Sequence, residues 1–179
     1  MYKYSTLEEE IKDIYSSIGI LKPTTGLWDL ELIAEKLKII VHYKAKGSEA
    51  VRVLGMPCII IDSRLSKKKK WEDFCHELCH VIHHVGIQAN LPDLFIELQE
   101  NHANAFMYHF AVPSFMLNRV KLPQIKSEAV NLISDLFCVS HSFATKRLEM
   151  YIRKLHSFRY QAFLVQRCKE KERLIYANN

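Results

Sequence analysis

The sequence predicts an α+β fold that is mostly helical, with a small three-stranded sheet and a C-terminal helical region. Three observations predict this class. Apolar residues recur at helical spacing over most of the chain, the stretch between residues 39 and 62 is rich in β-branched residues, and only 5 glycines and 5 prolines interrupt 179 residues. We expect a core over residues 1–122 and a helix-turn-helix-like region over residues 123–179 that packs on it.

The N-terminal part of the chain predicts two helices followed by three strands. Thr6 and Glu9 stand in capping-box register, so the first helix begins there and ends near Gly19. A second helix is expected over residues 27–39, where leucine, isoleucine and alanine form one apolar stripe. Short strands follow in IIVHY and in VRVLGMPCIIID, and Gly55 divides the second segment into a hairpin.

The rest of the chain predicts helices only. Residues 67–85 contain neither glycine nor proline, which predicts a helix. Another helix is expected over residues 93–111, because helices usually end ahead of a proline and Pro113 follows. Three further helices are expected, within residues 127–137, within residues 140–155 and after His156.

Composition restricts the class of protein. The chain has 5 cysteines, and its N-terminus, MYKYSTLEEEIKD, lacks the apolar stretch of a secretory signal, so we expect reduced thiols and a cytoplasmic protein. No apolar run approaches the ~18 residues needed to cross a bilayer, so we expect no membrane contact. The net charge is +5, with basic residues gathered at 67–70 and in the last third of the chain. A basic surface favours acidic partners without identifying one.

The segment CHELCHVIHH, residues 75–84, carries the strongest chemical pattern. Residues four apart on a helix lie about 40° apart around the axis and one turn along it, so His76 and His80 can hold one ion together. Glu77 points to the side of that pair and can act as a general base without binding the metal. This is the HExxH arrangement of zinc peptidases. A catalytic zinc of this type needs a third protein ligand and an open position.

Glu100 is the predicted third ligand. It follows His80 on the next expected helix, and Asn104 comes one turn later on the same face. This spacing resembles the ExxxD of thermolysin-like peptidases, in which the later side chain orients a ligand histidine. Asn104 can accept a hydrogen bond from an imidazole N–H in the same way. The rival ligands are Asp93, Glu97 and His102. Glu97 is the alternate ligand, since it shares roughly the face of Glu100, whereas His102 points about 200° away.

The other ligand-type side chains of the segment have structural interpretations. His84 lies two turns from His76, too far along the axis to bind the same ion, so we expect it to pack or to orient a ligand. His83 is expected to be exposed. Cys75 and Cys79 point away from the histidine pair, and we expect both to be small buried thiols.

These motifs give the chain a family resemblance. HELCHVIHH followed by ENHANAFMYHFAVP resembles the ImmA/IrrE family of metallo-endopeptidases, whose signature is approximately HELGHxxxH and then ExxANxFAxxLLMP. The hairpin ending in CIIID and the later segment VSHSFATKRL resemble the family too, so the likeness covers most of the chain. It implies a minimal zincin-like core. The chain departs from the pattern at Cys79, where the family usually has glycine, and at His102, where it often has glutamate.

The resemblance also implies a function. By position, His76, His80 and Glu100 would bind Zn²⁺, with Mn²⁺ as the alternative metal, and Glu77 would be the catalytic base. Family members inactivate helix-turn-helix repressors by specific cleavage and are often carried on integrative elements and prophages or serve stress responses. A protein substrate of that kind is therefore expected here.

Two other classes of function remain open at the sequence level. The segment over residues 131–155 has a helix, a short turn and a basic second helix, which is compatible with a DNA-binding regulator. Against this class, Phe143, Leu148 and Ile152 suggest that the second helix is used mostly for core packing. The other alternative is a non-catalytic module with a closed structural metal site, in which Cys79 or His102 supplies a fourth ligand.

Overall fold

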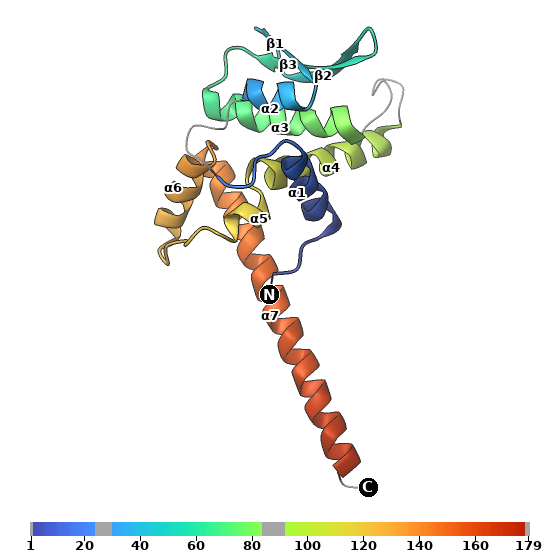
Figure 1. The fold of residues 1–179 in the computed structure, drawn as a ribbon, viewed down its shortest axis with the longest axis vertical. Helices are drawn as coiled ribbons and strands as arrows, with labels where there is room; N and C mark the ends of the chain where they lie inside the picture. The colour runs from blue at the N-terminus through green and yellow to red at the C-terminus, as the bar shows by residue number, and fades with distance from the viewer. Residues whose placement is uncertain (1, 24–29, 84–91, 178–179) are drawn as a thin grey trace.

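The computed structural model describes residues 2–23, 30–83 and 92–177. Its elements, in chain order, are α1 (Thr6–Ser17), α2 (Leu30–Lys36), β1 (Ile40–Lys44), β2 (Glu49–Val53), β3 (Met56–Asp62), α3 (Lys67–His83), α4 (Asp93–Ala111), α5 (Ser114–Leu117), α6 (Lys126–Leu136) and α7 (His141–Ala177). Figure 1 shows the sheet at one end of the molecule and α7 projecting from the other. The fold is α+β and mostly helical, so the predicted fold class is confirmed.

The sheet is mixed, with β3 in the centre. Strand β2 pairs antiparallel with β3, and β1 pairs parallel with it on the other side. The predicted hairpin is therefore confirmed. Its turn consists of Leu54 at φ 52° and Gly55 at φ 81°, the two left-handed positions of a tight type I′ connection. Because β3 is central and covered by α3, its residues from Cys58 to Asp62 are all buried.

Helix α3 lies between the sheet and α4 (Figure 1). Trp71, Phe74 and Leu78 on α3 are buried, as are Ala103 and Phe106 on α4. Because α3 packs against the sheet on one side and against α4 on the other, apolar residues flank its HELCH segment.

The N-terminal cap of α1 lies one residue earlier than the sequence predicts. The cap is Ser5, whose side chain accepts a hydrogen bond from the backbone N–H of Glu8, while the Glu8 carboxylate accepts one from the backbone N–H of Ser5. The predicted pair of Thr6 and Glu9 was wrong. The pairs Ser5–Glu8 and Thr6–Glu9 have the same spacing, so spacing alone cannot tell which one caps the helix. Tertiary contacts favour the first pair, because Glu8 is buried beside Ser114 and Lys154.

The C-terminal region differs from the prediction. Helix α7 runs unbroken from His141 to Ala177, so the predicted boundary near His156 was wrong. No glycine or proline occurs within α7, and nothing in its sequence forces an end. The four-residue helix α5, directly after Pro113, was not expected. The division of the chain after residue 122 stays a prediction, although α6 and α7 do pack on each other and α7 contacts α4.

Within the described ranges, none of the helices combines the length and apolar character required to cross a membrane.

Candidate metal centre

Two adjacent helices bring the predicted ligand residues together. His76 and His80 lie one turn apart on α3, and Glu100 lies on α4, whose course is fixed by its packing along α3. The three residues form one of two groups, in the described part of the chain, whose potential ligand atoms all lie within 4.8 Å of one another.

The separations within this group are short and similar. Nε2 of His76 lies 3.2 Å from Nε2 of His80 and 3.2 Å from Oε2 of Glu100. Nε2 of His80 lies 3.4 Å from Oε1 of Glu100. Burial lowers the pKa of His80, which favours the neutral imidazole that can act as a ligand.

These separations fit a tetrahedral ion. Bonds of about 2.0 to 2.2 Å from zinc to nitrogen or oxygen place neighbouring ligand atoms roughly 3.3 to 3.6 Å apart. Two histidines and one carboxylate are also a donor set that zinc commonly has in hydrolases. The Glu100 side chain is 41% exposed, so the group is open to solvent on one side. A fourth position can therefore be reached by water or substrate.

Glu77 lies beside this group and is not part of it. Burial raises the pKa of the Glu77 carboxyl to about 7, against the lowering effect of a hydrogen bond from the backbone N–H of Ala50. A carboxyl with such a pKa can both accept and release a proton near neutral pH. Ala50 belongs to β2, an edge strand of the sheet, so that strand lies next to the candidate site.

The remaining candidates lie less centrally. Glu97, the alternate ligand, is exposed on α4 and belongs to neither group of converging ligand atoms. Asn104 is exposed one turn after Glu100, and its expected hydrogen bond to an imidazole stays a prediction. His84 falls outside the described residues.

The cysteines of α3 are buried, as the sequence predicted. Burial raises the pKa of Cys79 to about 12 and that of Cys75 well above its usual value, so neither thiol is activated as a nucleophile. His83 was expected to be exposed and is not, because its ring packs against His102 and Phe106.

Cys79, His83 and His102 form the second group of converging ligand atoms, which the sequence reasoning missed. A signal existed in the sequence, because Cys79 and His83 have the same four-residue spacing as His76 and His80. Neither Cys79 nor His102 belongs to the group of His76, His80 and Glu100. A closed structural site at that group would require one of them as a fourth ligand.

Sequence comparison identifies related proteins. The model of the peptidase M78 family, described as the IrrE N-terminal-like domain, matches residues 34–149, more than half of the chain. The phage-like element PBSX protein XkdA of Bacillus subtilis (strain 168) is 44% identical over 157 residues, which cover 88% of this chain and 78% of that protein. The uncharacterized protein YqaB of the same strain is 40% identical over 154 residues, which cover 86% of this chain and 88% of that one.

A solved structure shares the fold. A Mycobacterium tuberculosis transcriptional regulator superposes with a TM-score of 0.56 and 16% sequence identity over 77% of this chain. The match spans 44% of the regulator, less than half of its length, and at this identity it shows similarity of fold alone.

Proposed function

Because the chain belongs to the peptidase M78 family, we propose that it is a metal-dependent endopeptidase with His76, His80 and Glu100 as metal ligands and Glu77 as general base. The observation that carries the proposal is the convergence of two imidazole nitrogens and a carboxylate at 3.2 to 3.4 Å, beside the half-buried Glu77. Zinc is the metal that best suits this donor set, with manganese as the alternative.

A divalent metal held by these three side chains supplies Lewis-acid activation of water and polarisation of the scissile carbonyl. The protein's own residues do the rest. The Glu77 carboxylate takes a proton from the attacking water and passes it to the nitrogen of the leaving amine. Desolvation of the Glu77 carboxyl raises its pKa, which makes the carboxylate a stronger base for the first step.

Substrate would bind as an extended segment along β2. Among the described residues, β2 pairs in the sheet with β3 alone, so its other edge is not paired with a strand of that part of the chain. Main-chain pairing with such an edge holds a peptide without requiring deep pockets. The hydrogen bond from the backbone N–H of Ala50 to Glu77 supports this proposal, because it puts β2 beside the proposed general base.

The proposed substrate is a helix-turn-helix repressor of a mobile element, prophage or stress regulon. Support comes from the relative XkdA, which is named as a protein of a phage-like element. The family resemblance of the sequence motifs points to the same class of substrate. We place the protein in the cytoplasm, where such a repressor acts.

A DNA-binding regulator is the second candidate function. The observation that favours it is the presence of basic residues along α7. Phe143, Ala144 and Leu148 at the start of α7 are buried, however, so this helix packs into the body where a recognition helix would have to be exposed. The peptidase proposal therefore has more support.

Co-expression with candidate helix-turn-helix repressors from the same genome tests the peptidase proposal. Intact-mass analysis should reveal two repressor fragments whose masses sum to that of the repressor plus one water. Glu77→Gln should lower the cleavage rate by at least about 100-fold, the lower range for loss of a general base. Equal cleavage by the wild type and Glu77→Gln would refute the assigned mechanism.

A further inference from the structure

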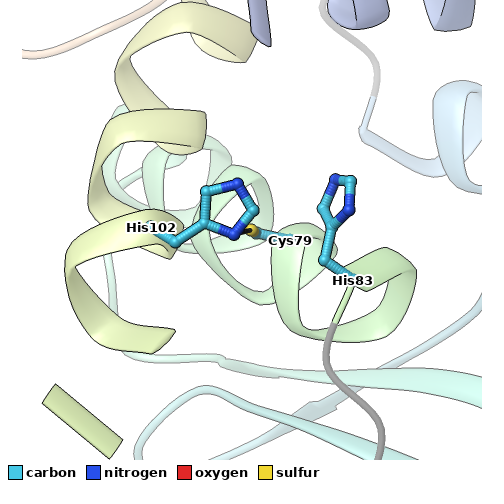
Figure 2. A group of neighbouring side chains, drawn as sticks. All are labelled: Cys79, His83 and His102. Carbon is cyan, nitrogen blue, oxygen red and sulfur yellow. Dashed lines mark hydrogen bonds between the residues drawn. The ribbon is translucent and has the colours of Figure 1, made fainter. Parts of the chain in front are cut away.

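A second cluster of metal-ligand side chains lies on the other flank of the contact between α3 and α4. Cys79 and His83 come from the last turns of α3, and His102 reaches toward Cys79 from α4 (Figure 2). The potential ligand atoms of these three residues all lie within 4.8 Å of one another. None of the three belongs to the catalytic group proposed above.

We propose that Cys79, His83 and His102 form a second metal site, which binds a thiophilic divalent ion of the zinc class and clamps α4 to α3. One thiolate and two imidazoles are a donor set that favours zinc over harder cations such as magnesium or calcium. The site is structural in character, since its cysteine is fully buried and its histidines are half-buried.

The measured distances suit such an ion. Sγ of Cys79 lies 3.8 Å from Nδ1 of His102. A tetrahedral zinc with a sulfur bond of about 2.3 Å and a nitrogen bond of about 2.0 to 2.1 Å separates the two atoms by about 3.6 Å. The rings of His83 and His102 lie edge to face, with centroids 5.0 Å apart. The three potential ligand atoms lie within 4.8 Å of one another, compared with about 3.3 to 3.6 Å around a tetrahedral zinc.

The surroundings of His83 give a second indication. Its Nε2 is shielded from solvent and lies 3.1 Å from Oε1 of Glu10, on α1. Although the two atoms are close, their geometry does not satisfy a hydrogen bond. A carboxylate beside a ligand histidine is a common feature of zinc sites, where it orients the ring or balances the charge of the ion. Glu10 is placed to do either.

Helix geometry explains how one contact can hold two separate sites. Ala103, at the centre of the contact, is fully buried, and its small side chain lets the helices approach closely. Glu100 lies about 60° to one side of Ala103 around the α4 axis, and His102 lies about 100° to the other side. On α3, each site takes two residues one turn apart. An ion in the second site would therefore fix the segment of α4 that carries Glu100.

Metal binding at this site has a simple proton balance. The Cys79 thiol loses its proton to solvent as the sulfur–metal bond forms, and both imidazoles bind through a neutral nitrogen. No oxidation or reduction takes place.

Cobalt(II) chloride, titrated into the full-length chain under reducing conditions, tests the proposal. Sulfur ligation produces a near-ultraviolet charge-transfer absorption, which the catalytic group cannot produce because it contains no sulfur. The wild type should bind two ions per chain and develop this absorption. Glu100→Gln should lose one ion and keep the absorption, whereas Cys79→Ala and His102→Gln should each lose one ion, and Cys79→Ala should lose the absorption.

Cys75→Ala is the matched control, since Cys75 is equally buried one turn earlier on α3 and lies outside both groups. It should keep the absorption. Absence of the band in the wild type at saturating cobalt, or its persistence in Cys79→Ala, would overturn the proposal. Neither result would affect the catalytic group, which is probed by the loss of an ion in Glu100→Gln.

Thermal unfolding gives a readout that remains useful if one variant folds poorly. Zinc ions added to Glu100→Gln should raise its midpoint through the second site alone, as for any ligand that binds only the folded state. His102→Gln combined with Glu100→Gln should remove this rise. A rise of the same size in both variants would contradict the proposal.

Discussion

At the scale of single residues, Glu8 is the buried charge on which the N-terminal part of the fold depends. Burial alone would raise its pKa, but hydrogen bonds from Lys154, Ser114 and Tyr2 have the larger effect and lower the pKa to about 2. The carboxylate thus connects α1 to α5 and α7. The same glutamate also caps α1, so its ionised form serves two purposes in the folded state.

The low pKa of Glu8 makes stability depend on pH. A carboxyl with a lower pKa in the folded than in the unfolded state stabilises the fold above the unfolded value, near 4.5, and this contribution is lost as the pH falls toward 2. Glu8→Gln should destabilise the protein by about 1.5 to 3 kcal/mol at pH 7, the range for hydrogen bonds to charged groups. The stability of Glu8→Gln should also fall less than that of the wild type between pH 5 and pH 2.5. Urea unfolding at several pH values measures both effects.

Glu9→Gln is the control for this prediction, because Glu9 is exposed on the same helix turn. It should change stability by less than about 0.5 kcal/mol, as most surface substitutions do. A parallel loss of stability with falling pH in Glu8→Gln and the wild type would show that another group causes the acid sensitivity.

The proposed metal ligands show which parts of a candidate site a sequence can predict. His76, Glu77 and His80 lie within one helical turn, so the helical period alone determines their relative positions. The position of Glu100 relative to these residues depends on how α4 packs along α3. The helical period cannot predict that packing, and Glu100 was predicted from the family motif. The cluster of Cys79, His83 and His102 was missed because His83 was judged exposed. Only the packing of α4 reveals that it is covered.

At the scale of elements, Arg147 holds α7 against the end of α4. Its side chain is fully buried, with Nε donating to the Val112 carbonyl at 3.1 Å and Nη2 donating to Ser114 Oγ at 2.6 Å. Burial lowers its pKa to about 10, which still leaves it charged at neutral pH. This contact gives a physical reason for the arginine in the segment VSHSFATKRL.

Arg147→Leu should destabilise the protein by roughly 3 to 5 kcal/mol, since removing one member of a buried charged network leaves its partners without compensation. Arg153→Leu, on an exposed face of the same helix, should cost less than about 0.5 kcal/mol. Denaturant unfolding compares the two variants. Equal stabilities would mean that α7 is not anchored through Arg147.

Most element positions followed from local sequence, and the errors have physical causes. Helices α3 and α4 were predicted well because they are long, periodic and followed by proline or glycine. The cap of α1 was misplaced because two overlapping pairs had equal spacing, and burial of Glu8 decided between them. The continuity of α7 was missed because a breakpoint was assumed where the sequence has no helix-breaking residue.

At the scale of the whole molecule, the sheet and the two central helices form the body that carries both metal-ligand groups, and α7 extends far beyond it (Figure 1). The outer part of α7 exposes apolar side chains, including Tyr160, Phe163 and Val165. Its inner part is buried in the body through Phe143 and Ala144. The inner part of α7 is therefore buried and its outer part is exposed, a difference that the sequence did not predict.

The burial of the inner part of α7 argues against the DNA-binding alternative. If α7 acts as a packing element and not as a recognition helix, the protein should form no tight complex with duplex DNA even at low salt. Gel shifts over a range of salt concentrations provide the measurement. A tight complex that weakens steeply with added salt would favour a nucleic-acid function, since release of counterions from phosphates gives that dependence.

The central claim is that His76, His80 and Glu100 hold the catalytic metal. Zinc per chain, measured by elemental analysis in a Cys79→Ala background that removes the proposed second site, tests it most directly. We predict about one zinc in that background, about one after adding Glu77→Gln or Glu97→Gln, and a large loss after adding Glu100→Gln. Retention of zinc with Glu100→Gln, or its loss with Glu97→Gln, would contradict the assignment and move the third ligand elsewhere on α4.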